Sequence, residues 1–250
     1  MTATQFELEP ETYAALVDWP KRLANEGPFF RRWFERVGAR RVLDVACGTG
    51  HHAALFHSWG LDVEGADVEP AMLAYCRAQH GASDMLRWAA RSFTGEPPSG
   101  QFDAVVCIGN SLALVPDLSV VQQGLNHMLA ALRPGGVCLV QVVNLWRLPV
   151  GPITWQRQLR LKRPAGDVLL IKGIHRVGDC GYVEFGELRL GPESFSHEFH
   201  STRILGLTDA ALRAAAEAAG GCDAACVGTY QDDPYEPPRS ADIILTCRRA

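Results

Sequence analysis

Short apolar runs alternate with segments of helical spacing between residue 41 and about residue 143. RVLDVA at 41–46 is such a run, and it ends at the turn CGTG before HHAALFHSWG, whose apolar positions share one helical face. This repeated order is typical of βα units, whose strands pair in parallel within one buried sheet. Further strands are predicted at LDVEGAD (61–67), MLRWAA (85–90), FDAVVCIG (102–109) and VCLVQVV (137–143).

The pattern changes after Asn144. Three segments there resemble strands separated by the turn sequences VGDCG and GPES, which predicts an antiparallel meander inserted into the α/β unit. TDAALRAAAEAAGG at 208–221 has the Thr/Asp start and the Gly end of a helix, and apolar stretches at 222–228 and 241–247 would complete the sheet. The meander strands are expected at 168–177, 181–190 and 196–205.

These boundaries predict an α/β fold. We expect a Rossmann-like, mostly parallel sheet of seven strands with helices on both faces, plus the inserted antiparallel β meander. VDWPKRL and GPFFRRWFERVG indicate one or two helices before the sheet. The expected divisions are an N-terminal helical lid (1–40), a ligand-binding α/β core (41–144), an inserted antiparallel lid region (145–206), and a C-terminal helix and strands that complete the sheet (207–250).

Composition and charge restrict the partners. The 250 residues are 47% hydrophobic and carry a net charge of −4 without a block of Lys or Arg, so nucleic acid and membrane are not expected as partners. The N-terminus lacks a signal-peptide pattern, and no apolar run approaches the roughly 18 residues of a membrane span, which predicts a cytoplasmic protein.

The eight cysteines contain no CxxC and are expected to be reduced thiols. The expected partner is a small molecule, and assembly into a homo-oligomer is left open.

The segment DVACGTG (44–50) stands between the first strand and the next helix. A glycine-rich turn there lets a ligand approach the backbone N–H groups at the helix N-terminus, which predicts a nucleotide-like cofactor. The GxGxxA spacing at 48–53, followed by Asp67, also matches a dinucleotide fingerprint. Asp44 weighs against that alternative, because its charge would repel a pyrophosphate but suits an ammonium group.

Four motifs in series are more specific than any one glycine pattern. DVACGTG is followed by GADVEPAML (65–73), FDAVV (102–106) and LRPGG (132–136). This series resembles the class I methyltransferases over residues 41–143. The resemblance implies S-adenosylmethionine as the cofactor and S-adenosylhomocysteine as its product.

Three shorter motifs narrow the resemblance. DWPKR (18–22), EGPFF (26–30) and CIGNS (107–111) are similar to segments of the glycine and sarcosine N-methyltransferases. This similarity extends to Asn144 and covers the last hundred residues only in outline. It implies transfer of a methyl group to a small-molecule acceptor, with an amine nitrogen as the expected target.

The resemblance gives roles to residues at the strand ends. Asp67 would accept hydrogen bonds from two ribose hydroxyls, and a cap for the following helix is the alternative. Arg22 would bind the methionine carboxylate with its planar guanidinium, and Met72 would pack against the adenine or into the core. WAAR (88–91) holds no acidic residue for the adenine amino group, so backbone groups of its alanines must serve. The expected cofactor-binding residues are Trp19, Arg22, Asp44, Ala46, Gly48, Gly50, Asp67, Val68, Met72, Ala89, Ala90, Cys107 and Ile108.

Asn110, after the fourth strand, is the expected catalytic and substrate-orienting residue. By resemblance it faces the methyl acceptor, and a turn-forming Asn after Gly is the alternative. Asn144 and Arg147 are the other expected substrate-binding residues. Val143 stands where the glycine-type enzymes carry an arginine that grips the amino acid carboxylate, which argues against glycine itself as acceptor. Arg147 would lie one turn later and could reach the same pocket.

Other polar residues receive structural interpretations. His51 and His52, at a helix start, are expected to be solvated, whereas His197 and His200 would point to opposite faces of a strand, which argues against a metal site. No Ser/His/Asp set is recognisable, which fits a displacement that mainly needs alignment. Three alternatives stay open: O- or C-methylation of a small metabolite, an NAD-dependent oxidoreductase, and a methyltransferase-like binding protein without catalysis.

Overall fold

Within the described residues, 9–98, 101–163, 166–191 and 194–250, seven strands form the main sheet of the computed structural model. Their order is β10-β11-β5-β4-β1-β2-β3; β1 to β5 are parallel, and β10 and β11 join antiparallel at one side. The predicted sheet is thus confirmed, while residues 1–8 of the predicted lid and part of the predicted GPES turn lie outside the described residues. The strands are β1 (Arg41–Val45), β2 (Asp62–Asp67), β3 (Leu86–Ala90), β4 (Phe102–Cys107), β5 (Leu132–Val143), β10 (Gly221–Val227) and β11 (Asp242–Arg249).

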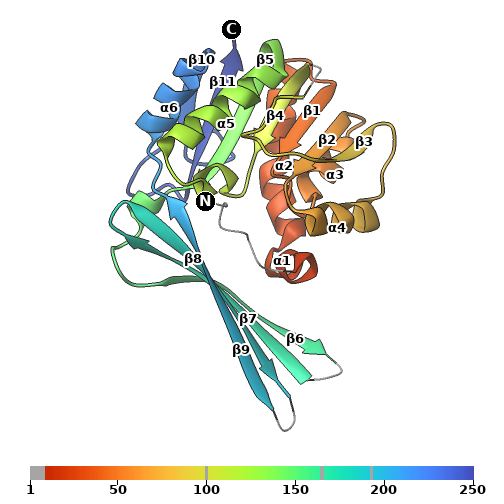
Figure 1. Cartoon of the computed structure of the whole chain (residues 1–250). Coiled ribbons are helices and arrows are strands. Elements are labelled where there is room, and N and C mark those ends of the chain that lie inside the picture. Colours follow the sequence, from red (N-terminus) through yellow and green to blue (C-terminus); the bar gives the residue numbers. More distant parts are fainter. Residues whose placement is uncertain (1–8, 99–100, 164–165, 192–193) are drawn as a thin grey trace.

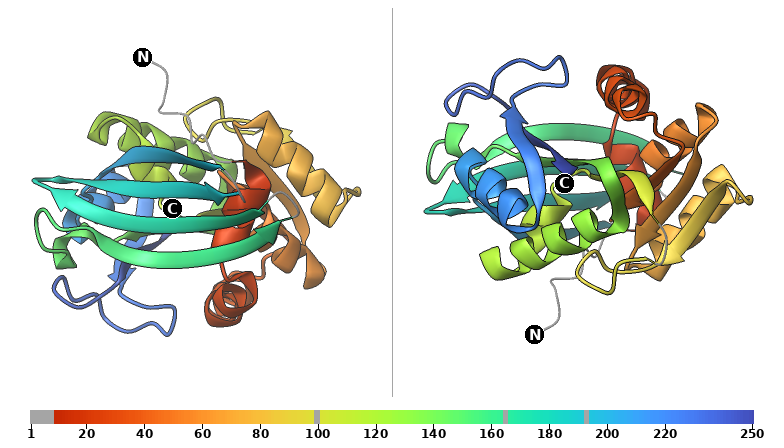
Figure 2. Two further views of the ribbon diagram at one scale, coloured as in Figure 1. Left: turned by 90° about the horizontal axis from the view of Figure 1, so that it is seen from below. Right: turned by 90° about the horizontal axis from the view of Figure 1, so that it is seen from above.

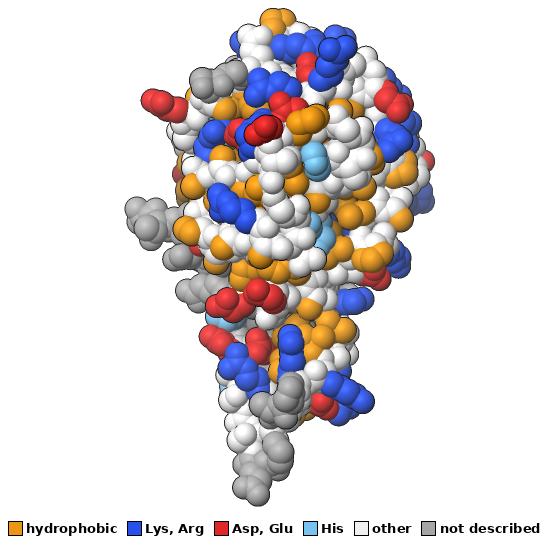
Figure 3. All heavy atoms as spheres, turned by 90° about the vertical axis from the view of Figure 1, so that its right-hand side faces the viewer, with side chains coloured by type: hydrophobic (Ala, Val, Ile, Leu, Met, Phe, Trp, Pro, Cys, Tyr) orange, Lys and Arg blue, Asp and Glu red, His pale blue; other side chains and the backbone are white. Residues whose placement is uncertain are grey.

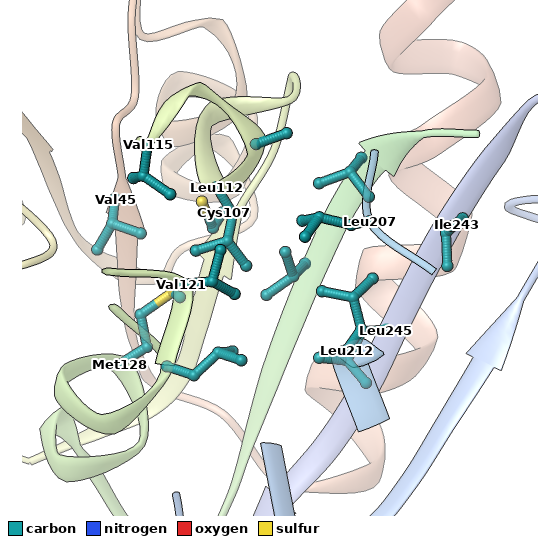
Figure 4. Close-up of a cluster of buried hydrophobic side chains, with 14 of the residues drawn as sticks. Val45, Cys107, Leu112, Val115, Val121, Met128, Leu207, Leu212, Ile243 and Leu245 are labelled. Carbon is teal, nitrogen blue, oxygen red and sulfur yellow. The ribbon is translucent and has the colours of Figure 1, made fainter. Parts of the chain in front are cut away.

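Helices cover both faces of this sheet (Figure 1). On one face the aromatic rings of Phe30, Phe34 and Phe56 pack together, with centroids 5.0 to 6.3 Å apart. On the other face an aliphatic core joins the helices to β4, β5 and β11 (Figure 4). The first face carries α2 (Trp19–Arg36), α3 (His51–Ser58) and α4 (Pro70–His80), and the second carries α5 (Leu118–Ala131) and α6 (Asp209–Ala218).

Local sequence signals explain where these helices begin. The Asp18 side chain accepts a hydrogen bond from Lys21 N at 3.2 Å, and Pro20 occupies the first turn of α2. Asp117 and Thr208 cap α5 and α6 in the same way. The cap of α2 follows directly on α1 (Pro10–Leu16), so the chain enters the sheet through two helices, as the first forty residues predict.

The second sheet has four antiparallel strands rather than the three predicted. β6 was not expected from the pattern, because it is an edge strand whose residues are mostly exposed and whose charged side chains interrupt the apolar alternation. Leu159 and Leu161 carry its half-buried face. The four strands, in their order across the sheet, are β6 (Thr154–Arg163), β7 (Gly166–Val177), β8 (Cys180–Leu190) and β9 (Phe195–Leu205).

This sheet lies across the carboxyl ends of the parallel strands (Figure 1), and the view from below in Figure 2 shows its strands in front of the main sheet. The second sheet packs tightly against the chain that follows β5, since a Cβ added at Gly181 would lie 2.7 Å from the Leu145 side chain. The far end of the sheet extends away from the core, so that the molecule narrows there (Figure 3). On the face in Figure 3, basic and acidic side chains are interspersed. No helix among the described residues is long and apolar enough to cross a membrane.

Candidate functional site

A cavity of about 330 Å³ lies between the carboxyl ends of β1, β2 and β4 and the inward face of the second sheet. Ligands of parallel α/β sheets bind at this edge, where the strand order reverses beside the first strand. A more open groove lies outside it, on the far side of Trp19. Of the predicted residues, the cavity brings together Trp19, Arg22, Asp44, Ala46, Gly48, Asp67, Val68, Met72, Ile108 and Asn110.

Four predicted cofactor-binding residues do not line the cavity. Gly50 is packed from behind, since an added Cβ would lie 2.7 Å from both Cys76 Sγ and the Trp88 ring. Cys107 is fully buried below the cavity floor, and burial, followed by the charge of Asp44, raises the pKa of its thiol to about 12. The chain after β3 reaches the cavity through Ser92, Phe93 and Thr94, and not through Ala89 and Ala90.

The turn after β1 depends on left-handed backbone. Ala46 has a φ of 53° and Gly48 a φ of 54°, a region that glycine adopts without strain. The Gly48 N–H donates to Asp67 Oδ2 at 2.8 Å, which ties the turn to the end of β2. No atom lies within 4 Å of a Cβ added at Gly48, so this side of the turn is open to the cavity.

Asp67 serves as a cap and still faces the cavity. Its Oδ1 accepts from Glu69 N at 3.0 Å, and its Oδ2 accepts from Gly48 N. Each carboxylate oxygen has a second lone pair, so both interpretations of Asp67 fit its position. The carboxylate is 7% exposed, which leaves little competition from bulk water.

Asp44 has one carboxyl oxygen without a partner in the wall of the cavity. It is 3% exposed, and its Oδ2 has no hydrogen-bond partner among the residues described. Burial, followed by the nearby charge of Asp67, raises the pKa of Asp44 to about 8. A buried acceptor of this kind is satisfied by a cationic donor, such as a ligand's ammonium group, and not by a pyrophosphate.

Arg22 is held in the cavity wall by a buried network. Its Nε donates to Glu26 Oε1 at 2.8 Å, and the other oxygen of Glu26 lies 2.6 Å from His52 Nε2. Burial raises the pKa of Glu26, but the hydrogen bond from His52 and the charge of Arg22 outweigh it and lower that pKa. Burial lowers the pKa of His52, which favours the neutral ring.

The prediction that both helix-start histidines are solvated was wrong for His52, whereas His51 is half-buried. His52 is 6% exposed within the Glu26 network. The His51 ring stacks on Trp19, with centroids 4.0 Å apart and planes 1° from parallel. Both contacts arise because α2 packs against the start of α3. Their partners, Glu26 and Trp19, are far from the two histidines in the sequence.

Asn110 forms a turn at the end of β4 and also lines the cavity. Its φ is 74°, so it does form a left-handed turn after Gly109. Its Oδ1 accepts a hydrogen bond from Val143 N at 2.6 Å, which links the ends of β4 and β5.

Asn144 and Arg147 are not brought to the cavity. Asn144 is fully buried; its Nδ2 donates to the carbonyls of Pro237 and Ser240, at 2.7 and 2.8 Å. Its Oδ1 accepts from Trp146 N and from the Tyr235 hydroxyl, both at 3.1 Å. Arg147 is exposed in the 3-10 turn that follows. Asn144 therefore holds the chain before β11 in place.

The second sheet supplies residues that the sequence reasoning missed. Lys172, Val183, Phe185, Thr202 and Ile204 line the cavity from β7, β8 and β9. A signal for one of them was present in the alternation of β7. Lys172 stands two positions from Leu170 and two from Ile174, so it shares their inward face although it is charged.

The remaining chemistry-bearing side chains show no metal site. In the described part of the chain, no group of three or more His, Cys, Asp or Glu could hold a metal ion. The eight cysteines are free thiols. His200 and Glu198 form an ion pair at 3.4 Å on β9.

Known proteins match the segment that builds this cavity. A sequence profile described as a methyltransferase domain matches residues 42–136. A glycine/sarcosine N-methyltransferase of Parasynechococcus marenigrum is 37% identical over 139 residues, which are 54% of this chain and 49% of that protein. The chain carries a class I S-adenosylmethionine-dependent methyltransferase domain. The predicted family and cofactor are confirmed for this domain.

The relatives match only part of this chain. A glycine N-methyltransferase of Oryctolagus cuniculus is 34% identical over 125 residues, 43% of this chain and 42% of that protein. The chain spans about half the length of the curated relatives it matches.

Solved structures share the fold over the whole chain. An amino pentose methyltransferase of Micromonospora echinaspora, solved with S-adenosylmethionine bound, matches with a TM-score of 0.74 and 23% identity, and each chain is fully covered. The sugar N-methyltransferase of a Streptoalloteichus species matches with a TM-score of 0.77 and 23% identity, over 100% of this chain and 95% of the other. These matches establish the fold of the methyltransferase domain together with its second sheet.

Proposed function

We propose that this protein transfers a methyl group from S-adenosylmethionine to the amine nitrogen of a small molecule. The unpaired Oδ2 of Asp44 carries the proposal, because it offers a buried carboxyl acceptor, which ionises beside a cation, to the ammonium of a methionine moiety. The cofactor supplies, when bound, a methyl group on a sulfonium, which is an activated leaving group. The chain therefore needs to hold two reactants in line and to exclude water.

The cavity residues divide this task. Asp44 would bind the ammonium and Arg22 the carboxylate of the methionine moiety, while Asp67 would accept from the ribose hydroxyls. The open side of Gly48 would let the cofactor approach the turn. Ser92, Phe93 and Thr94, with Val68 and Met72, would surround the adenine.

The second sheet and the N-terminal helices would cover the acceptor. We propose that the segments 1–40 and 145–206 act as the lid of the core 41–144, and that 207–250 completes the core sheet. Support comes from Tyr13 of α1 and Phe185 of β8, which line the cavity opposite the strand ends. All eight cysteines are free thiols, which is compatible with our proposal of a cytoplasmic protein.

An amine larger than glycine is the acceptor we favour. Val143 replaces the arginine expected of glycine-type enzymes, and Arg147, which might have compensated by position, is exposed. The matched structures are named as methyltransferases of an amino pentose and of a sugar amine. Asn110 would orient such an acceptor through its amide nitrogen, because its oxygen is already bonded to Val143 N.

Calorimetry and a turnover screen test the proposal together. We expect S-adenosylhomocysteine to bind and NAD not to bind, and we expect S-adenosylhomocysteine to form with at least one member of a panel of amino sugars, amino acids and simple amines. Asp67→Ala should abolish binding of the cofactor product, whereas Asn110→Asp should lower turnover and leave that binding unchanged. Glu217→Gln, at an exposed helix position, is the control. Binding of NAD alone, or binding without any turnover, would overturn the proposal.

A further inference from the structure

Lys172 is the charged residue that the second sheet places in the cavity wall. Its neighbours along the inward face of β7 are Leu170 and Ile174, both 2% exposed. Its Nζ lies 5.5 Å from the centroid of the Phe185 ring on β8. Among the described residues, none forms a hydrogen bond or an ion pair with the Lys172 Nζ. An amine so placed, half-buried and without an anionic partner, is costly to keep charged.

The groups around Lys172 do not compensate its charge. In the register of the sheet, Lys172 pairs with Arg157 of β6 on one side and with Phe185 of β8 on the other. Phe185 pairs in turn with His200 of β9. Two acidic residues further along this face have other partners: Glu187 pairs with Arg189, and Glu198 with His200. The other titratable groups that line the cavity are Tyr13 and Arg22 of the N-terminal helices and Asp44, Cys47, His52, Asp67 and Glu69 of the core.

We propose that Lys172 Nζ accepts the proton of the methyl-accepting amine, an inference that rests on the proposed N-methylation. The acceptor arrives as R–NH3⁺, and the Nζ lone pair of neutral Lys172 removes one proton from it. The freed lone pair of R–NH2 attacks the methyl carbon; the C–N bond forms, the C–S bond breaks, and the electron pair of that bond stays on sulfur. The product leaves as R–NH2⁺–CH3, and the Lys172 ammonium then returns its proton to water.

The other side chains that could accept this proton are already hydrogen-bonded or belong to the part of the cavity proposed for the cofactor. His52 is bonded to Glu26, and the oxygens of Asp67 accept from backbone N–H groups. Asp44 is the partner proposed for the cofactor ammonium. Burial, followed by the charge of Arg22, lowers the pKa of Lys172 to about 8, so that roughly a tenth to a fifth of the amine is neutral between pH 7 and 7.4, far more than for an ordinary lysine.

Two substitutions separate a proton acceptor from a cation that binds an anion. Lys172→Arg keeps the positive charge but cannot lose a proton near neutral pH, and Lys172→Met keeps the length without charge. We expect both variants to lose about 100-fold or more in kcat/KM at pH 8, within the range for removal of a general base. S-adenosylhomocysteine affinity should stay within about threefold of the wild type, since the cofactor half is unchanged.

A weakly basic acceptor should rescue the variants. An acceptor analogue whose amine is already neutral at pH 7 needs no proton acceptor, so the deficit of both variants should shrink to less than about tenfold with it. In parallel, NMR of the full-length protein with 13C-labelled lysine would follow the Cε resonance that Lys172→Arg removes. Its midpoint should lie well below that of an ordinary lysine, and this measurement does not depend on turnover.

The outcomes are distinguishable. If Lys172→Arg retains turnover while Lys172→Met only raises KM, the residue binds an anionic group of the substrate and the proposal is overturned. An NMR midpoint at the ordinary lysine value overturns it as well. If the wild type binds S-adenosylhomocysteine but methylates no amine, the proposed function fails and this inference fails with it; if the wild type and Lys172→Arg turn over equally, only the inference fails.

Discussion

The Nε2 atom of His52 lies 2.6 Å from Oε2 of Glu26, and both side chains are 7% exposed. This contact joins the start of α3, directly after the glycine turn, to the middle of α2. The same carboxylate receives Arg22 Nε at 2.8 Å, so one buried anion fixes both the turn and the guanidinium that faces the cavity. Removing that anion should therefore affect the cofactor before it affects the chemistry.

Glu26→Gln should weaken S-adenosylhomocysteine binding by about tenfold, because the charge-assisted bond that positions Arg22 is lost, and such bonds contribute about 1.5 to 3 kcal/mol. The thermal midpoint should also fall, since the neutral amide leaves Arg22 buried without its counter-charge. Calorimetry and thermal unfolding measure the two effects. Glu236→Gln, which breaks an exposed pair with Arg239, is the matched control and should change neither. Unchanged affinity in Glu26→Gln would show that Arg22 does not contact the ligand.

Binding of the cofactor product should release a proton from Asp44. Its pKa of about 8 without ligand means that the carboxyl is mostly protonated at pH 7, and an ammonium placed beside it favours the ionised form. Proton release should be close to one per site near pH 7 and should approach zero as the pH rises above 8, where Asp44 is already ionised. Calorimetry in buffers of different ionisation enthalpy counts these protons.

Asp44→Asn is the control for that measurement. It should eliminate the proton release and lower the affinity by about 10- to 100-fold, the loss expected when a buried charge-assisted bond is removed. Proton release that persists in Asp44→Asn belongs to another group, and the assignment of the ammonium to Asp44 would then be wrong.

The order of the core elements could be predicted because its signals are local. An apolar run, a turn glycine and a capping side chain lie within a few residues of one another, as in the turn from Asp44 to Gly50. β6 escaped prediction for the same reason: an exposed edge strand buries too little on either face to produce a clear alternation. The turn after β1 and the end of β2 are each marked by a short motif, and most of the residues predicted there line the cavity.

The substrate half could not be predicted because it is assembled from distant segments. Lys172 meets Phe185 across a strand pair and shares a cavity with Arg22, which is far from it in the sequence. Asn144 follows β5 at a position where the family resemblance suggested a substrate contact, but its four side-chain hydrogen bonds go to the chain before β11 and to the 3-10 turn Leu145–Arg147. Local spacing places Lys172 on the inward face of β7 but does not identify the residues that it meets across the cavity.

Gly48 and Gly50 should respond differently to alanine, although they are two residues apart. Gly50→Ala adds a methyl group 2.7 Å from Cys76 Sγ and the Trp88 ring at a φ of 75°, so the free energy of unfolding should fall by about 2 to 4 kcal/mol, from overpacking and backbone strain together. Gly48→Ala meets no protein atom and should cost only the strain, about 1 to 2 kcal/mol. Its methyl group should instead lower the affinity for S-adenosylhomocysteine. Urea unfolding and calorimetry distinguish the two, and an equal loss of stability in both variants would contradict the packing seen around Gly50.

Asn144→Ala should act on stability and not on cofactor binding. The substitution leaves the carbonyls of Pro237 and Ser240 without their donor and the Tyr235 hydroxyl without its acceptor, in a site that is fully buried. A loss of about 2 to 4 kcal/mol in the free energy of unfolding is expected, since each unsatisfied buried group costs about 1 to 3 kcal/mol and the site relaxes only partly.

Asn144→Asp provides the sharper comparison, because it keeps the acceptor for Trp146 N and removes the two donors. It should destabilise the protein at least as much as Asn144→Ala, since a carboxylate would then face two carbonyl oxygens. Measured well below the thermal midpoint, both variants should bind S-adenosylhomocysteine as the wild type does. A large rise in KM for the acceptor with little change in stability would return Asn144 to the substrate pocket, where the sequence motif first suggested it.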